Sequence, residues 1–437
     1  MSAKYIIIGN SAAGIGAVEG IRQIDKQGEI TLITNEPHHT YSRPLISYLL
    51  LGKVDEEKMK YRDSGFYTDN NCKLLANVTV TGIDAKAKQV VLSDNNRIPY
   101  DKLLVATGSS AFVPPFDGLD SVKDKFTFMS LDDAHNLDAA LAPALSEKKR
   151  VLIIGAGLIG LKCAEGIAER VSHITVVDLA PRILSSILDD EGAKVVQSHI
   201  ESKGIEFKLA ASVKKFESNA AILEPQPSPS QTGEGSPLES GEKINFDVLV
   251  LAVGVRPNTA LLKDIANIER GIIVDNKSQT SAPDIFSAGD CTQTLDVSSG
   301  QNKIMALLPN AYMQGECAGV NMAGGNKTFD RAIPMNAIGF FGLHMITAGN
   351  YTGDVYKGQV ADNKGQAANG YKRLFYSDNK LTGYILIGDV DKAGIYTSLI
   401  RERTPLDTID FALVCEKPGL MAFTKEDRMA KLGGKSK

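Results

Sequence analysis

The feature that most restricts the fold of this chain is a strand–glycine–helix–strand pattern that occurs twice. The first copy is KYIIIGNSAAGIGAVEGIRQIDKQGEITLITNE, residues 4–36, and the second is RVLIIGAGLIGLKCAEGIAERVSHITVVD, residues 150–178. In each copy an apolar strand enters a turn of small residues, and a helical segment leads to a second apolar strand that ends in an acid. Neighbouring parallel strands need such a crossover. The first glycines of the two turns are 146 residues apart (155 − 9), so we expect two separate domains of this kind.

The second turn carries the complete GxGxxG pattern, with glycines at 155, 157 and 160. These glycines allow a tight turn, the approach of backbone to a pyrophosphate, and close packing of the helix on the strand. The pyrophosphate then meets the free N–H groups at the start of the helix. Asp178 ends the second strand, and a carboxylate there binds ribose hydroxyls and disfavours a 2′-phosphate. The pattern predicts an NAD(H) site, and Arg182 is more readily explained as a surface or pyrophosphate-side residue.

The first turn has Gly9, Ser11 and Gly14, with serine in place of the middle glycine. Serine is small enough to let the backbone approach a phosphate, so this turn also predicts a dinucleotide site. Glu36, or with less support Thr34–Asn35, is expected to meet the ribose of that nucleotide.

Two apolar runs and two irregular stretches organise the rest of the chain. YDKLLVATGSS (100–110) and FDVLVLAVGVRPN (246–258) predict buried strands that complete the two sheets. Residues 217–243 are rich in Pro, Ser, Gly and Glu, which is typical of a mobile loop. Beyond about residue 327 the pattern indicates antiparallel strands followed by a helix, with a hairpin turn at SDNK. The expected fold class is α/β with two Rossmann-like domains and a C-terminal α+β domain.

Composition excludes several functions. A formal net charge of −4 gives no electrostatic basis for binding nucleic acid or anionic lipid. The five cysteines show no CxxC pattern, which argues against a disulfide framework or a metal site held by this chain and favours the cytoplasm. No window is apolar for long enough to span a membrane, and the glycine-rich N-terminus is better explained as a strand and turn than as a signal peptide.

Taken in order, the motifs GNSAAG, ATGS, GAGLIG, AVGVRPN, FSAGD and LLPNAYMQGECAGVNMAG resemble those of the FAD- and NAD-dependent pyridine nucleotide–disulfide oxidoreductase superfamily. In that family the N-terminal turn holds FAD, and the NAD domain is inserted between two halves of the FAD domain. The resemblance therefore implies FAD-domain segments at 1–112 and 258–326, an NAD(H) domain at 113–257, a C-terminal domain at 327–412 and a basic tail at 413–437.

The resemblance also assigns site residues. For FAD these are Gly9, Ser11, Ala12, Ala13, Gly14, Glu36, Arg43, Pro44, Thr107, Gly108, Gly289, Asp290, Pro309 and Asn310. For NAD(H) they are Gly155, Gly157, Leu158, Ile159, Gly160, Glu165, Asp178 and Gly254. Asp290 is expected at the ribityl chain rather than as a helix N-cap, and Arg43 and Glu165 near the reacting rings. No metal site and no certain catalytic side chain are expected, since hydride transfer to flavin needs no protein base. For the same reason, His38 and His39 are expected to be surface residues rather than acid–base catalysts.

Cysteine is absent from HHTYSRPLISYLLLGK (38–53), where disulfide reductases of the superfamily carry CxxxxC. This resembles the branch with NADH:rubredoxin oxidoreductase, the flavin domain of nitrite reductase and the flavin subunit of phenylglyoxylate dehydrogenase. The implied activity is hydride transfer between NADH and FAD, with electron exchange to rubredoxin, ferredoxin or iron–sulfur subunits. A stand-alone NADH oxidase producing hydrogen peroxide and a non-catalytic subunit remain alternatives. The sequence is compatible with a homo-oligomer and with a subunit of a larger complex. The tail is equally explained as a docking segment for an acidic partner or as a disordered end.

Overall fold

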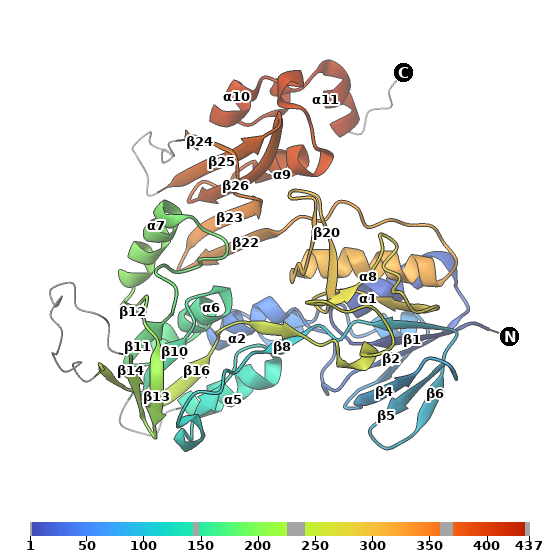
Figure 1. Ribbon diagram of the computed structural model, residues 1–437, viewed down its shortest axis with the longest axis horizontal. Coiled ribbons are helices and arrows are strands. Elements are labelled where there is room, and N and C mark those ends of the chain that lie inside the picture. Colours follow the sequence, from blue (N-terminus) through green and yellow to red (C-terminus); the bar gives the residue numbers. More distant parts are fainter. Residues whose placement is uncertain (1, 143–147, 225–240, 359–369, 433–437) are drawn as a thin grey trace.

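Figure 1 shows the computed structural model, which describes residues 2–142, 148–224, 241–358 and 370–432. Three groups of elements, each around its own main sheet, make up the molecule, and the C-terminal group lies above the other two in this view. Within the described ranges, no helix has both the length and the apolar character needed to cross a membrane. Residues 225–240 of the loop predicted at 217–243 lie outside the described ones. The prediction is wrong for residues 220–223, which form a strand paired on both sides, with Ala220 and Ala221 buried.

The first main sheet combines strands from both ends of the 1–326 region. All five strands are parallel, in the order β19-β7-β1-β2-β3. Strand β19 follows the second glycine turn in sequence and still pairs with β7. The residues between β7 and β19 therefore include a separate sheet that is inserted into the first one in sequence. The elements are β1 (Lys4–Ile8), α1 (Ala12–Ile24), β2 (Glu29–Ile33), β3 (Cys72–Leu75), β7 (Lys102–Val105), β19 (Ile285–Ser287) and α8 (Leu308–Met322).

The second main sheet is formed by residues between β7 and β19. Its order is β12-β11-β10-β16-β9, again all parallel, with helices α5 and α6 close to it in Figure 1. The run predicted at 246–258 supplies β16 beside β10, as expected. The elements are β9 (Lys125–Phe126), α5 (Leu131–Leu141), β10 (Arg150–Ile154), α6 (Leu158–Ile167), β11 (His173–Val177), α7 (Asp190–Glu201), β12 (Ile205–Lys208) and β16 (Val248–Leu251).

The two chain crossings between these sheets run side by side. Strand β8 (Ser109–Ala111) pairs antiparallel with β17 (Val255–Pro257), with Ala111 opposite Val255. Smaller antiparallel sheets flank the main ones. One contains β4 (Val80–Asp84), β5 (Gln89–Leu92) and β6 (Arg97–Pro99), and another contains β13 (Val213–Glu217), β14 (Ala220–Leu223) and β15 (Lys243–Asn245). In the third, β20 (Thr292–Asp296) pairs with β21 (Gln301–Lys303) on one side and, in parallel, with the short strand β18 (Ile272–Ile273) on the other.

The C-terminal sheet is antiparallel, in the order β22-β23-β26-β25-β24, followed by α9 (Ala393–Glu402). Asp378 and Asn379 form the turn between β25 and β26 with positive φ, which confirms the predicted hairpin. The fold class expected from the sequence is thereby confirmed. The strands are β22 (Met335–Phe340), β23 (Leu343–Gly349), β24 (Asp354–Gly358), β25 (Tyr371–Ser377) and β26 (Lys380–Ile387).

The described part of the tail is helical. It comprises α10 (Phe411–Glu416) and α11 (Lys425–Lys431), and Phe423 between them is buried. Lys431 donates to Glu402 and Ser398 of α9, which ties α11 to the C-terminal group. A disordered end, one of the two interpretations of the tail, is therefore wrong for residues 413–432.

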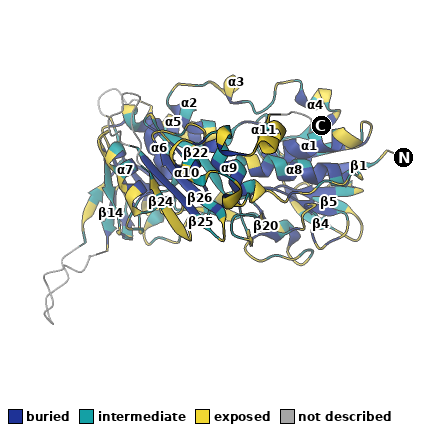
Figure 2. Ribbon diagram, turned by 90° about the horizontal axis from the view of Figure 1, so that it is seen from above, coloured by how far each residue is buried: buried dark blue, intermediate teal, exposed yellow. Residues whose placement is uncertain are grey.

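Helices α1 and α8 pack with their backbones in contact. Gly315 and Gly319 of α8 face α1, and a Cβ atom built on either would lie 2.0 or 2.2 Å from the carbonyl oxygen of Ala13 or Ala17. On the other side, a Cβ on Gly16 or Gly20 would lie 2.3 Å from a carbonyl oxygen of α8. Figure 2, coloured by burial, shows the two helices side by side and largely buried. This contact fixes the N-terminal end of α8 against that of α1.

Candidate functional site

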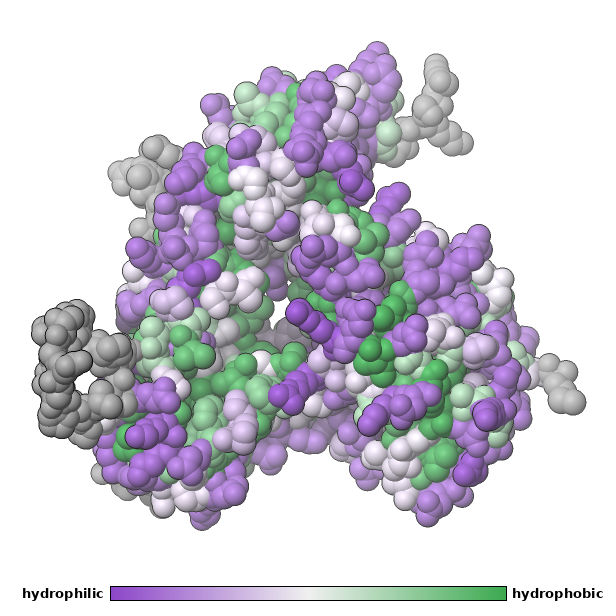
Figure 3. Space-filling view, in the orientation of Figure 1, coloured by the Kyte–Doolittle hydropathy of each residue, from purple (hydrophilic) through white to green (hydrophobic). Residues whose placement is uncertain are grey.

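A cavity of about 570 Å³ lies at the carboxyl ends of β1, β2 and β7. Ligands of open α/β sheets bind at this edge. The cavity draws its wall from segments far apart in sequence, between Ile8 and Ala311. Figure 3 also shows a hollow where the three groups of elements meet, but no described residue of the C-terminal group lines the cavity. The lining includes ten of the fourteen residues that the sequence assigned to FAD, namely Gly9, Ser11, Ala12, Ala13, Glu36, Arg43, Thr107, Gly108, Gly289 and Asp290.

The first glycine turn is shaped by close backbone contacts. Gly9 has φ +120°, and a Cβ there would lie 2.1 Å from the carbonyl oxygen of Ala106. A Cβ on Gly14 would lie 1.9 Å from the oxygen of Gly9, so this glycine allows α1 to start directly against the turn. Ser11 is the N-cap of α1 and its side chain makes no capping bond. The first N–H groups of α1 are thus available to an anionic group.

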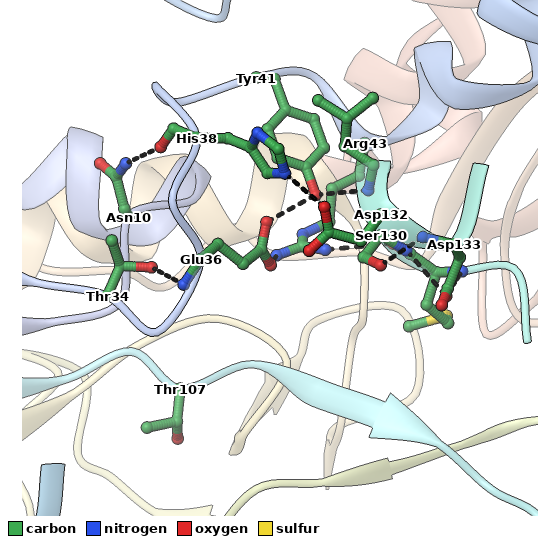
Figure 4. Close-up of polar contacts among 12 residues, drawn as sticks. Asn10, Thr34, Glu36, His38, Tyr41, Arg43, Thr107, Ser130, Asp132 and Asp133 are labelled. Atoms are coloured by element: carbon green, nitrogen blue, oxygen red, sulfur yellow. Dashed lines mark hydrogen bonds and ion pairs between the residues drawn. The ribbon is translucent and has the colours of Figure 1, made fainter. Parts of the chain in front are cut away.

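Glu36 and Arg43 form an ion pair at the cavity wall. Figure 4 shows the carboxylate of Glu36 directed at the guanidinium of Arg43, with Thr107 apart from them across the cavity. The hydroxyl of Tyr41 also donates to Glu36, at 2.8 Å, and Arg43 donates to the carbonyl of Met129 at 3.1 Å. Arg43 is therefore both salt-bridged and part of the lining. The role of Glu36 at a ribose stays a prediction.

Asp290 is a half-buried carboxylate in the cavity wall. Burial raises the pKa of its carboxyl, while the hydroxyl of Ser109, which donates at 3.4 Å, and the charge of Arg43 act in the opposite direction. No helix starts after Asp290, because the chain continues into β20, so it is not an N-cap. The backbone N–H of Gly289 donates to Gln314 of α8 at 2.9 Å, which holds this turn beside α8.

Four assigned FAD residues lie outside the cavity lining. Gly14 and Pro44 lie in α1 and in the 3₁₀ turn Arg43–Leu45. Pro309 is in the first turn of α8, as expected for a helix start, and the Asn310 side chain donates to the carbonyl of Ile333 at 3.0 Å. Asn310 thus connects α8 to the start of the C-terminal group.

The second glycine turn repeats the geometry of the first. A Cβ on Gly155 would lie 2.3 Å from the carbonyl oxygen of Ala252, and one on Gly160 would lie 2.0 Å from the oxygen of Gly155. Gly157 is the N-cap of α6, with nothing within 4 Å of a built Cβ, and Leu158 and Ile159 begin the helix. The turn therefore leaves room for a ligand in front of α6. Gly254 lies just beyond β16, and its carbonyl accepts from the N–H of Phe112.

Asp178 lies directly beside this turn. Its carboxylate accepts from the backbone N–H of Ala156 at 2.6 Å and of Ala180 at 2.7 Å. Arg182 points elsewhere, to Asp190 at 3.0 Å and to the carbonyl of Leu188 at 3.3 Å. The acid is thus placed next to the turn, and the nearby arginine is engaged with the segment before α7.

Glu165 is buried between α6 and the C-terminal group. Lys162 donates to one carboxylate oxygen, and the backbone N–H of Phe341 donates to the other at 2.7 Å. The sequence reasoning missed Lys162, since a lysine inside a helix normally indicates an exposed position. It also missed Asn258 of the VRPN motif, whose side chain donates to the carbonyl of Thr107 at 2.9 Å and whose carbonyl accepts from the Thr107 hydroxyl at 2.7 Å.

Two histidines were expected at the surface. His38 instead lines the cavity and lies 2.7 Å from Asp132, and His39 lines it as well. Within the described residues, the Nε2 atom of His39 is buried without a hydrogen-bond partner. The sequence did not indicate that His38 and His39 line a cavity, because their position depends on the path of the chain after β2.

The five cysteines are free and buried, and none lines the cavity. Cys291, which follows Asp290, is fully buried with its thiol 3.7 Å from the carbonyl of Val105. Burial raises the pKa of Cys72 to about 12 and that of Cys415 to about 11, and likewise raises the pKa of Cys291. No thiol is therefore placed to exchange electrons at this site.

Comparisons with known proteins identify relatives over most of the chain. Residues 3–315 match the family described as pyridine nucleotide-disulphide oxidoreductase, and residues 334–404 match the rubredoxin NAD+ reductase C-terminal domain. The epsilon subunit of NADH-dependent phenylglyoxylate dehydrogenase from Aromatoleum evansii is 31% identical over 408 residues, covering 92% of both proteins. The NAD(P)H nitrite reductase of Bacillus subtilis (strain 168) is 29% identical over 92% of this chain, which spans only 48% of that relative. The covalent putidaredoxin reductase–putidaredoxin complex has the same fold, with a TM-score of 0.82 over 99% of each chain at 20% identity.

Proposed function

The chain belongs to the pyridine nucleotide-disulphide oxidoreductase family and is an FAD- and NAD(H)-dependent oxidoreductase, and from this premise we propose that it exchanges electrons between NAD(H) and a separate redox protein without a cysteine relay. The proposal assigns FAD to the first glycine turn and NAD(H) to the second. It keeps the domain limits expected from the sequence, at residues 112, 257, 326 and 412.

The cavity residues fit FAD by the chemistry they present. The turn Gly9–Gly14 brings backbone N–H groups to the start of α1, where a pyrophosphate binds. Asp290 is a half-buried carboxylate with one weak donor at 3.4 Å, so it has free acceptor capacity for the hydroxyls of a ribityl chain. Among the described residues, the Nε2 atom of His39 has no hydrogen-bond partner, and His39 lines the cavity, so this atom is available to a ligand.

The second turn fits NAD(H) rather than NADP(H). Asp178 lies against the turn, and a carboxylate accepts from ribose hydroxyls and repels a 2′-phosphate. Arg182, the nearest cation in sequence, is held by Asp190 and is directed away from the turn.

One observation carries the proposal: the FAD-side segment after Arg43 packs directly on the NAD-side helix α6. Helix α2 (Ile46–Leu50) contacts α6 so closely that a Cβ on Gly166 would lie 3.1 Å from the carbonyl oxygen of Ser47. The amine of Lys162 on α6 lies 4.5 Å from the ring centre of Tyr48 on α2. The segment that follows the cavity residue Arg43 thus lies against the helix that starts at the second turn, and hydride transfer requires the two nucleotides to be close.

The residues of the chain bind, orient and shield the reacting groups. When bound, FAD supplies the chemistry, because it accepts a hydride and releases electrons one at a time. The two turns would hold the pyrophosphates, and Asp290 and Glu36 would meet the polyol chain and the ribose. The contact of α1 with α8 holds the starts of both helices beside the cavity. Arg43 places a positive charge at the cavity wall.

We further propose that the partner is a small iron–sulfur or rubredoxin-type protein or a set of iron–sulfur subunits. The match of residues 334–404 to the rubredoxin NAD+ reductase C-terminal domain supports the former, and the relative that is a dehydrogenase subunit supports the latter. Five free cysteines support placement in a reducing cytoplasm.

The test is acceptor preference with FAD-loaded protein. We expect NADH to bleach the bound flavin under anaerobic conditions and to reduce ferricyanide and rubredoxin much faster than oxygen. Rapid peroxide formation without a partner would instead support a stand-alone NADH oxidase. Failure to retain FAD, with no oxidation of NADH after FAD is added, contradicts the proposal and favours a non-catalytic subunit.

A further inference from the structure

Lys162 is a buried lysine at the point where three segments meet. It lies on α6, five residues beyond the N-cap Gly157, and only 12% of its side chain is exposed. Its amine pairs with Glu165, donates to the carbonyl of Gly339 at 3.3 Å, and lies 4.5 and 5.8 Å from the ring centres of Tyr48 and Phe340. It thus contacts α6, α2 and the end of β22 together.

Glu165 completes the same cluster. Its second oxygen accepts from the backbone N–H of Phe341 at 2.7 Å, so both carboxylate oxygens are occupied. The carbonyl of Phe341 lies 3.2 Å from the ring of His199 on α7. The turn between β22 and β23 is therefore fixed to two helices of the second sheet.

Stability alone does not explain this pair. Burying two charges costs desolvation energy that their attraction only partly offsets, and well-packed apolar residues often do as well or better. Nor is the pair needed to attach the C-terminal sheet. Arg373 already pairs with Glu191, and Tyr371 donates to Asp189, both at the start of α7.

We propose that Lys162 is a positioning residue for the nicotinamide: it fixes the Glu165 carboxylate between α2 and the turn at Phe341, so that the C-terminal group forms part of the hydride-transfer site. This inference rests on the proposed function, because it places NAD(H) at the turn from which α6 starts. Lys162 lies about 7.5 Å and Glu165 about 12 Å along α6 from its N-cap, given a rise of about 1.5 Å per residue. A small displacement at such a point changes the distance between reacting rings more than it changes binding of the rest of the dinucleotide.

The experiment compares Lys162→Met, Lys162→Arg and Glu165→Gln with Arg373→Met as the matched control. Arg373→Met removes an ion pair between the same two groups of elements, away from the glycine turn. Flavin reduction by NADH is followed by anaerobic rapid mixing, the dissociation constant of NAD+ by calorimetry, and unfolding by a thermal scan.

We expect Lys162→Met and Glu165→Gln each to slow flavin reduction by on the order of 10- to 100-fold, with the NAD+ dissociation constant changed by no more than about threefold. Lys162→Arg should recover most of the rate, and Arg373→Met should keep it while lowering the melting temperature. The Gln variant keeps the shape of Glu165, so it remains informative if the Met variant does not fold.

Wild-type rates in both Lys162→Met and Glu165→Gln would overturn the inference, as would an equal slowing by Arg373→Met. Those outcomes leave the proposed function intact, since the wild-type protein is still reduced by NADH. Absence of flavin reduction in the wild-type protein would instead contradict the proposed function itself.

Discussion

The backbone contact between α1 and α8 makes Gly319→Ala a sharp test of how the cofactor cavity is held. The new Cβ would lie 2.2 Å from the carbonyl oxygen of Ala17. A carbon needs about 3.5 Å from such an atom, so the helices must separate by about 1 Å. The three atoms nearest to the new Cβ all belong to the backbone of Ala17, so no side chain can rotate away to make room.

The free-energy cost follows from two opposing effects. Overpacking a close-packed contact costs up to about 3 kcal/mol, and alanine gains about 1 kcal/mol over glycine in a helix. The net loss is about 2 kcal/mol, or about 30-fold in an equilibrium constant. Because α1 and α8 both start at the cavity, we expect the loss in FAD retention as well as in stability.

The assay measures FAD content after desalting and the melting temperature with and without added FAD. Gly394→Ala is the matched control, since Gly394 is also helical, in α9, and nothing lies within 4 Å of a built Cβ. We expect Gly319→Ala to melt about 4–8 °C lower and to lose FAD, and Gly394→Ala to be unchanged or slightly stabilised. A Gly319→Ala variant that melts no lower than Gly394→Ala and keeps its FAD would refute the reasoning.

Three further outcomes are expected. Burial raises the pKa of Asp290, so the ionised carboxylate destabilises the FAD-free protein at neutral pH. Asp290→Asn should therefore raise the melting temperature of the FAD-free protein at neutral pH, and this gain should vanish as the pH falls toward about 4. The same variant should bind FAD more weakly in an equilibrium titration. A neutral melting temperature at or below wild type would contradict this. Asp178→Ser removes the carboxylate beside the second turn, so the ratio of kcat/KM for NADPH over NADH should rise on the order of 10- to 100-fold, and an unchanged ratio would show that another group selects the cofactor. Iodoacetamide should leave NADH:ferricyanide activity intact in the native protein, because all five thiols are buried. Labelling of one thiol in step with inactivation would point to a sulfur relay.

The sequence was sufficient for the parts of the fold whose physical cause is local. Gly9 and Gly155 each need a conformation and a close approach that other residues disfavour, so the turns and their parallel strands could be predicted from short patterns. The same holds for the Asp378–Asn379 hairpin.

The parts that could not be predicted depend on contacts between distant residues. Glu165 and Phe341 are 176 positions apart, and only the folded chain shows that one N–H occupies the carboxylate. The sequence shows the glycines of α1 and α8, but it does not show that the two helices pack together. In the fold, Gly16 contacts Tyr312 and Gly319 contacts Ala17. The pairing of Glu36 with Arg43 likewise depends on the path of the chain after β2.

The antiparallel pairing of β8 with β17 makes the second sheet a single topological insertion into the chain. Ala111 and Val255 lie opposite each other, so residues 112–254 are topologically the loop of one very long hairpin. A two-residue Asn-Gly turn has the geometry to close that ribbon, which would convert the remaining chain to a single-nucleotide unit. A foreign dinucleotide domain whose two ends emerge side by side would fit the same junction, provided that it also presented apolar surface to α2 and to the C-terminal sheet, as α6 and α7 do here.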